Sequence, residues 1–296
     1  MYHLLPYEEP LFRPPSEAGS LIFQITFGCS RNCCTFCGMY KGKPFRIKPL
    51  KQILQEIATI PPNIRSRINR VFLADGDALV YPFDELRHIL DALNATFPGL
   101  ARVGSYASPA SLTTKDASQM EQLRLRKLRI LYFGLESGDN ATLAAVNKGY
   151  SADEMADMAA MARQAGMKLS VTAILGLAGK TRSLVHACAT ATWINRVNPE
   201  YFSLLTLFDR HNEVFVQSLD RCTYRELMLE ARELVACLQP ERTILRSNHV
   251  SNFLNLAGSY PKDRERLIAD VDAALTRAER IPGFLDTVPT YREEYY

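Results

Sequence analysis

Short apolar runs rich in β-forming residues alternate with amphipathic stretches of helical length along most of this 296-residue chain. The runs are continuous in Ile, Leu, Val, Phe or Tyr, which indicates strands that are buried on both faces. Such strands are typical of parallel sheets, because the crossover helices of βα units cover both faces of the sheet. The alternation therefore predicts an α/β fold.

Six βα units can be counted, enough for a single barrel-like domain, because α/β barrels commonly exceed ~200 residues in one domain. The expected strands are Leu21–Phe27, Val71–Ala74, Arg102–Tyr106, Ile130–Phe133, Leu169–Leu175 and Tyr201–Leu207. The expected helices are Leu50–Ile60, Phe83–Ala95, Ser118–Lys127, Ala152–Ala165, Ser183–Val197 and Tyr224–Leu238.

Local signals mark several helix ends. Ser151 with Glu154, and Thr223 with Glu226, have the spacing of capping boxes, in which hydroxyl and carboxylate each satisfy a free backbone N–H group. Gly166 follows an expected helix, where a glycine in the left-handed conformation closes the last turn.

The alternation breaks down from Thr243 onward. A polar segment, Arg246–Asn252, precedes one expected helix near Lys262–Arg280, and the last residues, Tyr291–Tyr296, are expected to form a mobile tail. The expected organisation is an N-terminal segment (1–20), a core barrel (21–240) and a C-terminal extension (241–296).

Composition argues against several kinds of partner. The 35 Lys and Arg residues against 32 Asp and Glu residues leave a net charge of only +3, so a nucleic-acid partner is not indicated. No apolar stretch approaches the ~20 residues of a membrane helix, and the N-terminus lacks the pattern of a signal peptide. We therefore expect a cytoplasmic protein without a membrane partner. In that reducing compartment, cysteines serve metal binding, catalysis or packing.

Four of the seven cysteines lie within nine residues, directly after the first expected strand: Cys29, Cys33, Cys34 and Cys37. A cluster of this kind can surround one metal ion or one iron–sulfur cluster. A structural zinc site usually combines two separated cysteine pairs, and no second pair follows here. The other cysteines, Cys188, Cys222 and Cys237, stand singly and are expected to be small buried hydrophobic residues.

Three ligands are expected from the cluster, because the adjacent side chains of Cys33 and Cys34 diverge. Cys34 and Cys37 form a chelate with two residues between them, and Cys29 is the natural third ligand. Three thiolates on a four-iron cluster leave one iron without a protein ligand, and an open metal position is typical of a catalytic site.

The cysteine-rich loop, with Phe36 just before the last cysteine, resembles that of radical S-adenosylmethionine (radical SAM) enzymes, whose usual spacing is Cys-x3-Cys-x2-Cys. Either choice of second ligand departs from that spacing by one residue. Cys34 is preferred because it keeps the chelate and the aromatic residue in place, and Cys33 is the alternative ligand.

Two further motifs extend the resemblance to roughly Leu21–Leu207. Asp75-Gly-Asp-Ala-Leu79 resembles the family's Gly-Gly-Glu-Pro loop, which implies that Gly76 and Asp77 lie at the amino group of SAM. Gly134-Leu-Glu-Ser-Gly138 resembles the Gly-x-Glu-Ser-Gly stretch of the branch with oxygen-independent coproporphyrinogen oxidase-like and elongator-like enzymes, which implies SAM contacts for Glu136 and Ser137.

Two more candidates lie at the carboxyl ends of expected strands, where α/β barrels place their active sites: Ser105 and Gly176. His186 lies among apolar residues of an expected helix and is interpreted as a satisfied core histidine. The residues do not indicate a catalytic side chain.

The resemblance implies a partial (β/α)6 TIM-type barrel that holds a [4Fe–4S] cluster and SAM. It also implies that a small protein, a flavodoxin or a ferredoxin, supplies an electron. SAM is then cleaved to methionine and a 5′-deoxyadenosyl radical, which abstracts hydrogen from an unidentified substrate. Two different functions remain open: a non-catalytic zinc or iron–sulfur module, and a redox protein that uses Cys34 and Cys37 as a dithiol.

Overall fold

The computed structural model describes residues 5–209 and 211–290, and the chain divides into two units. Of the described residues, unit 1 contains 5–32, 39–133 and 157–169, and unit 2 contains 33–38, 134–156, 170–209 and 211–290. Three elements contribute residues to both units: β6 (Leu128–Glu136), α7 (Ala152–Gln164) and β7 (Lys168–Leu175). The expected tail, Tyr291–Tyr296, lies outside the described residues.

The other elements of unit 1 are the strands β1 (Leu21–Gln24), β2 (Thr26–Phe27), β3 (Arg46–Ile47), β4 (Arg70–Ala74) and β5 (Arg102–Ala107), the helices α1 (Leu50–Thr59), α2 (Pro62–Arg65), α3 (Phe83–Thr96), α4 (Pro109–Leu112) and α5 (Ala117–Leu125), and two short 3-10 helices, η1 (Pro15–Glu17) and η2 (Ala78–Val80). Unit 2 adds α6 (Asn140–Ala145), α8 (Gly179–Val197), β8 (Tyr201–Thr206), α9 (Glu213–Ser218), α10 (Tyr224–Cys237), β9 (Ile244–Arg246), β10 (Ala257–Ser259) and α11 (Arg264–Ala278).

The main sheet has eight strands in the order β1-β4-β5-β6-β7-β8-β9-β10, in which β10 pairs antiparallel with β9. This confirms the α/β class and the partial barrel, because the described strands form an open sheet and no closed barrel. Among the described helices, none combines the length and the apolar composition that a membrane span requires.

In unit 1, β1 pairs in parallel with β4, and β4 with β5. The strand side chains are buried on both faces, with Phe23, Phe72 and Val103 fully inaccessible, as continuous apolar runs predict. The expected strand Leu21–Phe27 is wrong in one respect. It divides at Ile25, and Thr26–Phe27 pairs antiparallel with Arg46–Ile47 in a separate two-stranded sheet.

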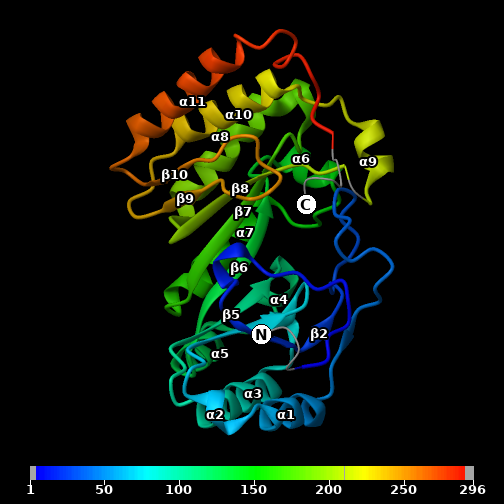
Figure 1. Cartoon of the computed structure of the whole chain (residues 1–296), viewed down its shortest axis with the longest axis vertical. Helices are drawn as coiled ribbons and strands as arrows, with labels where there is room; N and C mark the ends of the chain where they lie inside the picture. Colours follow the sequence, from blue (N-terminus) through cyan, green and yellow to red (C-terminus); the bar gives the residue numbers. More distant parts are fainter. Residues whose placement is uncertain (1–4, 210, 291–296) are drawn as a thin grey trace. The chain divides into compact units, whose positions relative to one another are not determined.

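In unit 2, β7 pairs in parallel with β8, and β8 with β9. The helices α8 and α11 both pack against α10, and Figure 1 shows these three helices as green, yellow and orange ribbons that lie side by side. After Thr243, where the sequence predicts a polar segment and one helix, the structure adds two strands, β9 and β10. Each strand has only three residues, too few to show a periodicity in the sequence.

The local helix signals are confirmed. Glu154 accepts from the backbone N–H of Ser151 at 2.7 Å, and Glu226 accepts from that of Thr223 at 2.8 Å. Gly166 adopts φ +82°, in the left-handed region. All six expected helices form, although α8 begins at Gly179 instead of Ser183. Four short helices, α2, α4, α6 and α9, have no counterpart among the expected elements.

Candidate functional site

The segment Cys33–Gly38 of unit 2 is a loop held by hydrogen bonds to its backbone. The N–H of Thr35 donates to the carbonyl oxygen of Val146 at 3.1 Å, Asn147 Nδ2 donates to the carbonyl oxygen of Cys33 at 3.1 Å, and Asn212 Nδ2 donates to that of Phe36 at 2.6 Å. Residues next to α6 and α9 thus anchor this loop. Cys34 and Cys37 are half-buried in it, whereas Cys33 is exposed.

A buried cation lies beside these cysteines. Lys148 is 7% exposed, and its Nζ lies 3.1 Å from Glu136 Oε1. Burial by itself lowers the pKa of Lys148, but Glu136 and the sulfur atoms of Cys34 and Cys37 outweigh burial and raise it. Lys148 therefore remains protonated, and its charge faces both the Glu136 carboxylate and the two thiols.

The glycine of the Gly-x-Glu stretch makes room for the glutamate. A Cβ atom on Gly134 would lie 2.1 Å from Glu136 Oε1, far inside van der Waals contact. Glu136 itself adopts φ +68°, a left-handed conformation that non-glycine residues seldom adopt. The carboxylate of Glu136 thus folds back over the backbone of Gly134 toward Lys148.

The serine of the same stretch belongs to a buried network. Ser137 Oγ lies 2.7 Å from Nδ1 of His186, and Nε2 of His186 lies 3.5 Å from Glu230 Oε1. Glu230 accepts from the backbone N–H of Gly176 at 2.9 Å and from the hydroxyl of Ser183. Two candidate strand ends, at Ser137 and at Gly176, are therefore joined through α8 and α10.

The prediction of a satisfied core histidine is half right. His186 is fully buried, yet its Nε2 has no hydrogen-bond partner among the described residues. Burial lowers the pKa of His186 to about 4 and raises the pKa of Glu230 to about 7. Both shifts favour an uncharged histidine beside a protonated glutamate, because each group avoids a charge in the core.

We expect Glu230→Gln to change the pH dependence of stability. Folded Glu230 keeps its proton up to about pH 7, whereas the unfolded chain loses it near 4.5, so this group's contribution to the free energy of unfolding falls as pH rises through that window. Glutamine does not titrate. Relative to the parent protein, the variant should gain on the order of 3 kcal/mol between about pH 5 and about pH 8. Urea unfolding at several pH values measures the difference.

Glu226 on the same helix provides the control. Burial opposes the shift, but Lys180 and the Thr223 cap lower the pKa of Glu226 below its ordinary value, so its contribution to the free energy of unfolding changes little above the titration range of a free glutamate. The difference between Glu226→Gln and the parent should hence stay constant over the same range. A constant difference for Glu230→Gln as well would contradict the protonated core glutamate.

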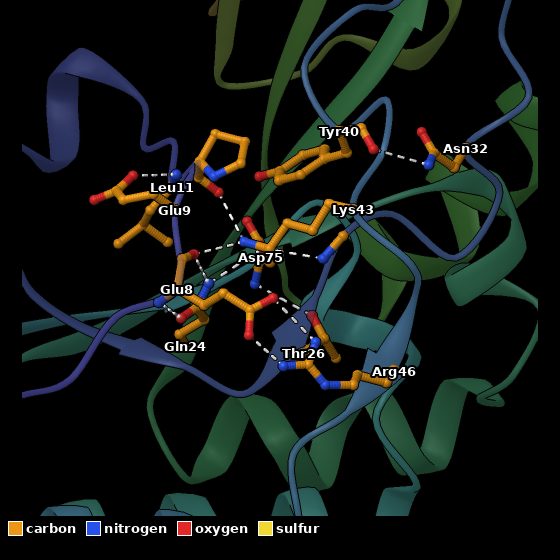
Figure 2. Close-up of polar contacts among 12 residues, drawn as sticks. Glu8, Glu9, Leu11, Gln24, Thr26, Asn32, Tyr40, Lys43, Arg46 and Asp75 are labelled. Carbon is orange, nitrogen blue, oxygen red and sulfur yellow. Dashed lines mark hydrogen bonds and ion pairs between the residues drawn. The ribbon is translucent and has the colours of Figure 1, made fainter.

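In unit 1, Asp75 is the centre of a second buried network, shown in Figure 2. Its Oδ2 accepts from Lys43 Nζ at 2.7 Å, from the backbone N–H of Gly28 at 3.0 Å and from Gln24 Nε2 at 3.2 Å. Gly28 adopts φ +69° and directly precedes Cys29, so Asp75 anchors the start of the cysteine loop. Among the described residues, neither Oδ1 of Asp75 nor the hydroxyl of Tyr40 makes a hydrogen bond of 3.5 Å or less, but the two groups are neighbours, and burial together with the Asp75 carboxylate raises the pKa of Tyr40.

Three residues of unit 1 were predicted to contact SAM, and each makes different contacts in the structure. A Cβ atom on Gly76 would lie 2.6 Å from the Tyr40 ring and 3.0 Å from Cβ of Cys29, so Gly76 lies against the first cysteine. Asp77 is buried and accepts from the hydroxyl of Ser30 and, at 2.6 Å, from that of Ser108. The buried hydroxyl of Ser105 donates to the carbonyl oxygen of Tyr106 at 2.9 Å.

The structure therefore brings Ser137 and Gly176 into one buried network of unit 2, pairs Glu136 with Lys148 in the same unit, and places Gly76 against Cys29 in unit 1. Sequence reasoning missed the residues that support them: Lys43, Asp75, Lys148 and Glu230. Only Glu230 leaves a clear signal, because a glutamate three residues after Leu227 and four before Leu234 falls on the apolar face of a helix.

Comparison with known proteins decides the family. The model of the Radical SAM superfamily matches residues 23–189, more than half of the chain. The chain belongs to the radical SAM superfamily. This confirms the family that the cysteine loop and the strand-end motifs resemble. A search of curated protein sequences finds no significant match.

Solved structures share the fold at low sequence identity. Coproporphyrinogen III oxidase (HemN) from Escherichia coli superimposes with a TM-score of 0.57 at 15% identity, over 73% of this chain and 51% of that one. The radical SAM methyltransferase TsrM from Kitasatospora setae, solved with cobalamin and a [4Fe–4S] cluster, gives 0.52 at 15% identity, over 86% and 52%. Methylornithine synthase (PylB) gives 0.51 at 12% identity, over 93% and 83%. The chain thus spans about half the length of the first two proteins.

Proposed function

We propose that this chain is a radical SAM enzyme that holds a [4Fe–4S] cluster through Cys29, Cys34 and Cys37 and cleaves SAM reductively. Membership of the superfamily supports SAM-dependent radical chemistry in general. The observation that carries the specific proposal is the set of cysteine thiols within nine residues, inside the matched region. The products would be methionine and a 5′-deoxyadenosyl radical that abstracts hydrogen from a substrate.

The local chemistry of the loop supports a cluster. Cys34 and Cys37 are half-buried on a loop that three hydrogen bonds from unit 2 hold in place. Lys148 supplies a positive charge beside them, which offsets the negative charge of thiolate ligands. Cys33 is exposed, which favours Cys34 as the second ligand. When bound, the cluster would supply the electron that SAM cleavage requires.

The candidate residues identified from the sequence are proposed to contact SAM. Glu136 and Ser137 would offer polar contacts, and Gly176 would present its backbone. Gly76 and Ser105 are proposed to contact SAM as well. Both carboxylate oxygens of Asp77 accept from Ser30 or Ser108, so we assign Asp77 to shaping the loop.

Asp75 is a better candidate than Asp77 to bind the amino group of SAM. Its unpartnered Oδ1 is a buried acceptor at the end of β4, next to Gly76. A buried carboxylate oxygen without a donor costs free energy, and a bound ammonium group would satisfy it. This residue belongs to the same Asp-Gly-Asp stretch that the resemblance singled out.

The remaining roles follow from the proposed chemistry. A flavodoxin or a ferredoxin would donate the electron, residues 21–240 would form the catalytic core, and residues 241–296 would form an extension. A cytoplasmic location remains a prediction. The similar structures include an oxidase, a methyltransferase and a synthase, so the substrate and the class of reaction are open.

Anaerobic reconstitution with iron and sulfide tests the proposal. The reconstituted protein should show the absorption of a [4Fe–4S] cluster and, with SAM and dithionite, should release 5′-deoxyadenosine that chromatography detects. A full cluster without 5′-deoxyadenosine would instead support a non-catalytic iron–sulfur module. A colourless protein that retains zinc would support a zinc module, and a reversible Cys34–Cys37 disulfide without a cluster would support a dithiol redox protein.

We expect Gly134→Ala to weaken SAM binding by about tenfold or more. The added methyl group would displace the Glu136 carboxylate from its position beside Lys148, since the two atoms cannot share that space. Equilibrium binding of SAM to the reconstituted variant measures the effect. Gly19→Ala is the control, because its Cβ would meet only the flexible end of Arg70. Equal affinities for both variants would argue against a SAM contact by Glu136.

A further inference from the structure

Three potential metal ligands meet on two packed helices of unit 2, away from the segment of clustered cysteines in the sequence. Cys188 lies on α8, and Glu233 and Cys237 lie one turn apart on α10. The two sulfur atoms are 3.5 Å apart, and Glu233 Oε1 lies 3.3 Å from Cys188 Sγ and 3.4 Å from Cys237 Sγ. The expectation that Cys188 and Cys237 are single buried hydrophobic residues is therefore wrong.

We propose that Cys188, Glu233 and Cys237 form a binding site for a thiophilic divalent cation of the Zn²⁺ class. Zinc–sulfur bonds of about 2.3 Å and zinc–oxygen bonds of about 2.0–2.2 Å, at tetrahedral angles, separate two sulfur ligands by about 3.8 Å and a sulfur from an oxygen by about 3.5 Å. The observed separations of the three ligand atoms are within about 0.3 Å of these values. The side chains are thus arranged as one face of a tetrahedron before any ion binds.

The chemistry and access of the site agree with this assignment. Two thiolates and one carboxylate are ligands that zinc accepts, and they select against Ca²⁺ and Mg²⁺, which prefer all-oxygen sites. All three side chains are partly exposed, so an ion can enter and a water molecule can complete the coordination.

A bound ion would connect two helices. Cys188 belongs to the middle of α8, whereas Glu233 and Cys237 occupy the last turns of α10. An ion held by ligands from both helices binds the folded protein better than the unfolded chain, and it therefore stabilises the fold in proportion to its affinity and concentration. This role is independent of SAM cleavage.

Zinc binding to the full-length chain tests the proposal, with Cys29, Cys33, Cys34 and Cys37 replaced by Ala so that only the new site remains. We expect about one Zn²⁺ per chain after gel filtration and a rise in melting temperature on addition of Zn²⁺. Co²⁺ in its place should give the near-ultraviolet absorption of cobalt–thiolate bonds. Adding Cys188→Ser or Cys237→Ser should remove all three signals, and Glu233→Gln should lower the affinity by about tenfold or more.

The control is Cys222→Ser, which changes a cysteine of the same unit outside this triad and should leave zinc binding unchanged. Should the background variant fail to fold, the zinc content of the reconstituted parent protein and of its Cys188→Ser form gives the same comparison. Equal zinc content in those two proteins would overturn the proposal. A second result would also overturn it: a Cys188–Cys237 disulfide, detected by mass spectrometry without reductant, together with no zinc binding once the thiols are reduced.

Discussion

Replacing Cys34 by Ala should abolish the release of 5′-deoxyadenosine, whereas Cys33→Ala should leave it within about twofold of the parent protein. The two cysteines are adjacent in sequence, but Cys34 is half-buried and Cys33 is exposed. Cys34 also forms the local turn with Cys37, whose backbone N–H lies 3.3 Å from the carbonyl oxygen of Cys34. A cluster that loses one of three protein ligands should not assemble or should not hold SAM.

The measurement combines iron content, the absorption spectrum and the yield of 5′-deoxyadenosine for each variant. Cys37→Ala and Cys29→Ala should behave like Cys34→Ala, because all three thiols are required. The opposite ranking, with Cys33→Ala inactive and Cys34→Ala active, would assign the second ligand to Cys33. Activity in both single variants would mean that either cysteine can serve.

Lys43→Met should lower the free energy of unfolding by about 3–5 kcal/mol, the usual cost of removing one partner from a buried ion pair. Lys43 is 5% exposed, and its Nζ donates to Asp75 Oδ2 at 2.7 Å and to the carbonyl oxygens of Glu8 and Pro10 at 2.7 and 2.8 Å. The variant would leave the Asp75 carboxylate charged and buried without its cation. Chemical unfolding followed by circular dichroism measures the loss.

Two comparisons make this result specific. Arg46→Met removes the same charge from an ion pair with Glu8 that is about half exposed, so its effect should be much smaller. Adding Asp75→Asn to Lys43→Met should recover part of the stability, because a neutral amide needs no cation yet still accepts from Gly28. Similar losses for Lys43→Met and Arg46→Met would contradict a buried, paired Asp75.

The buried networks around Asp75 in unit 1 and around Lys148 and His186 in unit 2 support different residues of the proposed site. In unit 1, the contacts of Asp75 anchor the residue before Cys29, and Gly76 packs against that cysteine. In unit 2, Lys148 faces Glu136, and His186 supports Ser137. The residues proposed to touch SAM therefore depend on buried partners, of which Lys43, Lys148 and His186 lie outside the recognised motifs. Such partners hold functional side chains in position.

Much of the fold was predictable because its signals are local. Continuous apolar runs identified six of the eight strands of the main sheet, β1 and β4 to β8, since a strand covered by helices on both faces tolerates few polar residues. The capping boxes at Ser151 and Thr223 were predictable because the interacting residues are three positions apart. The short strands β9 and β10 were not predictable, since three residues form a strand only when a neighbouring strand supplies the hydrogen bonds.

The sequence by itself determined the α/β class, the position of the cysteine loop and the family, because each depends on residues close together in the chain. Only the tertiary structure decided which side chains support the site. Asp75 meets Lys43 across 32 positions, and Ser137 meets His186 across 49. The tertiary structure likewise brings Cys188 next to Cys237, which are 49 positions apart. Such pairs arise from the packing of whole strands and helices, and no local periodicity encodes which residues that packing brings into contact.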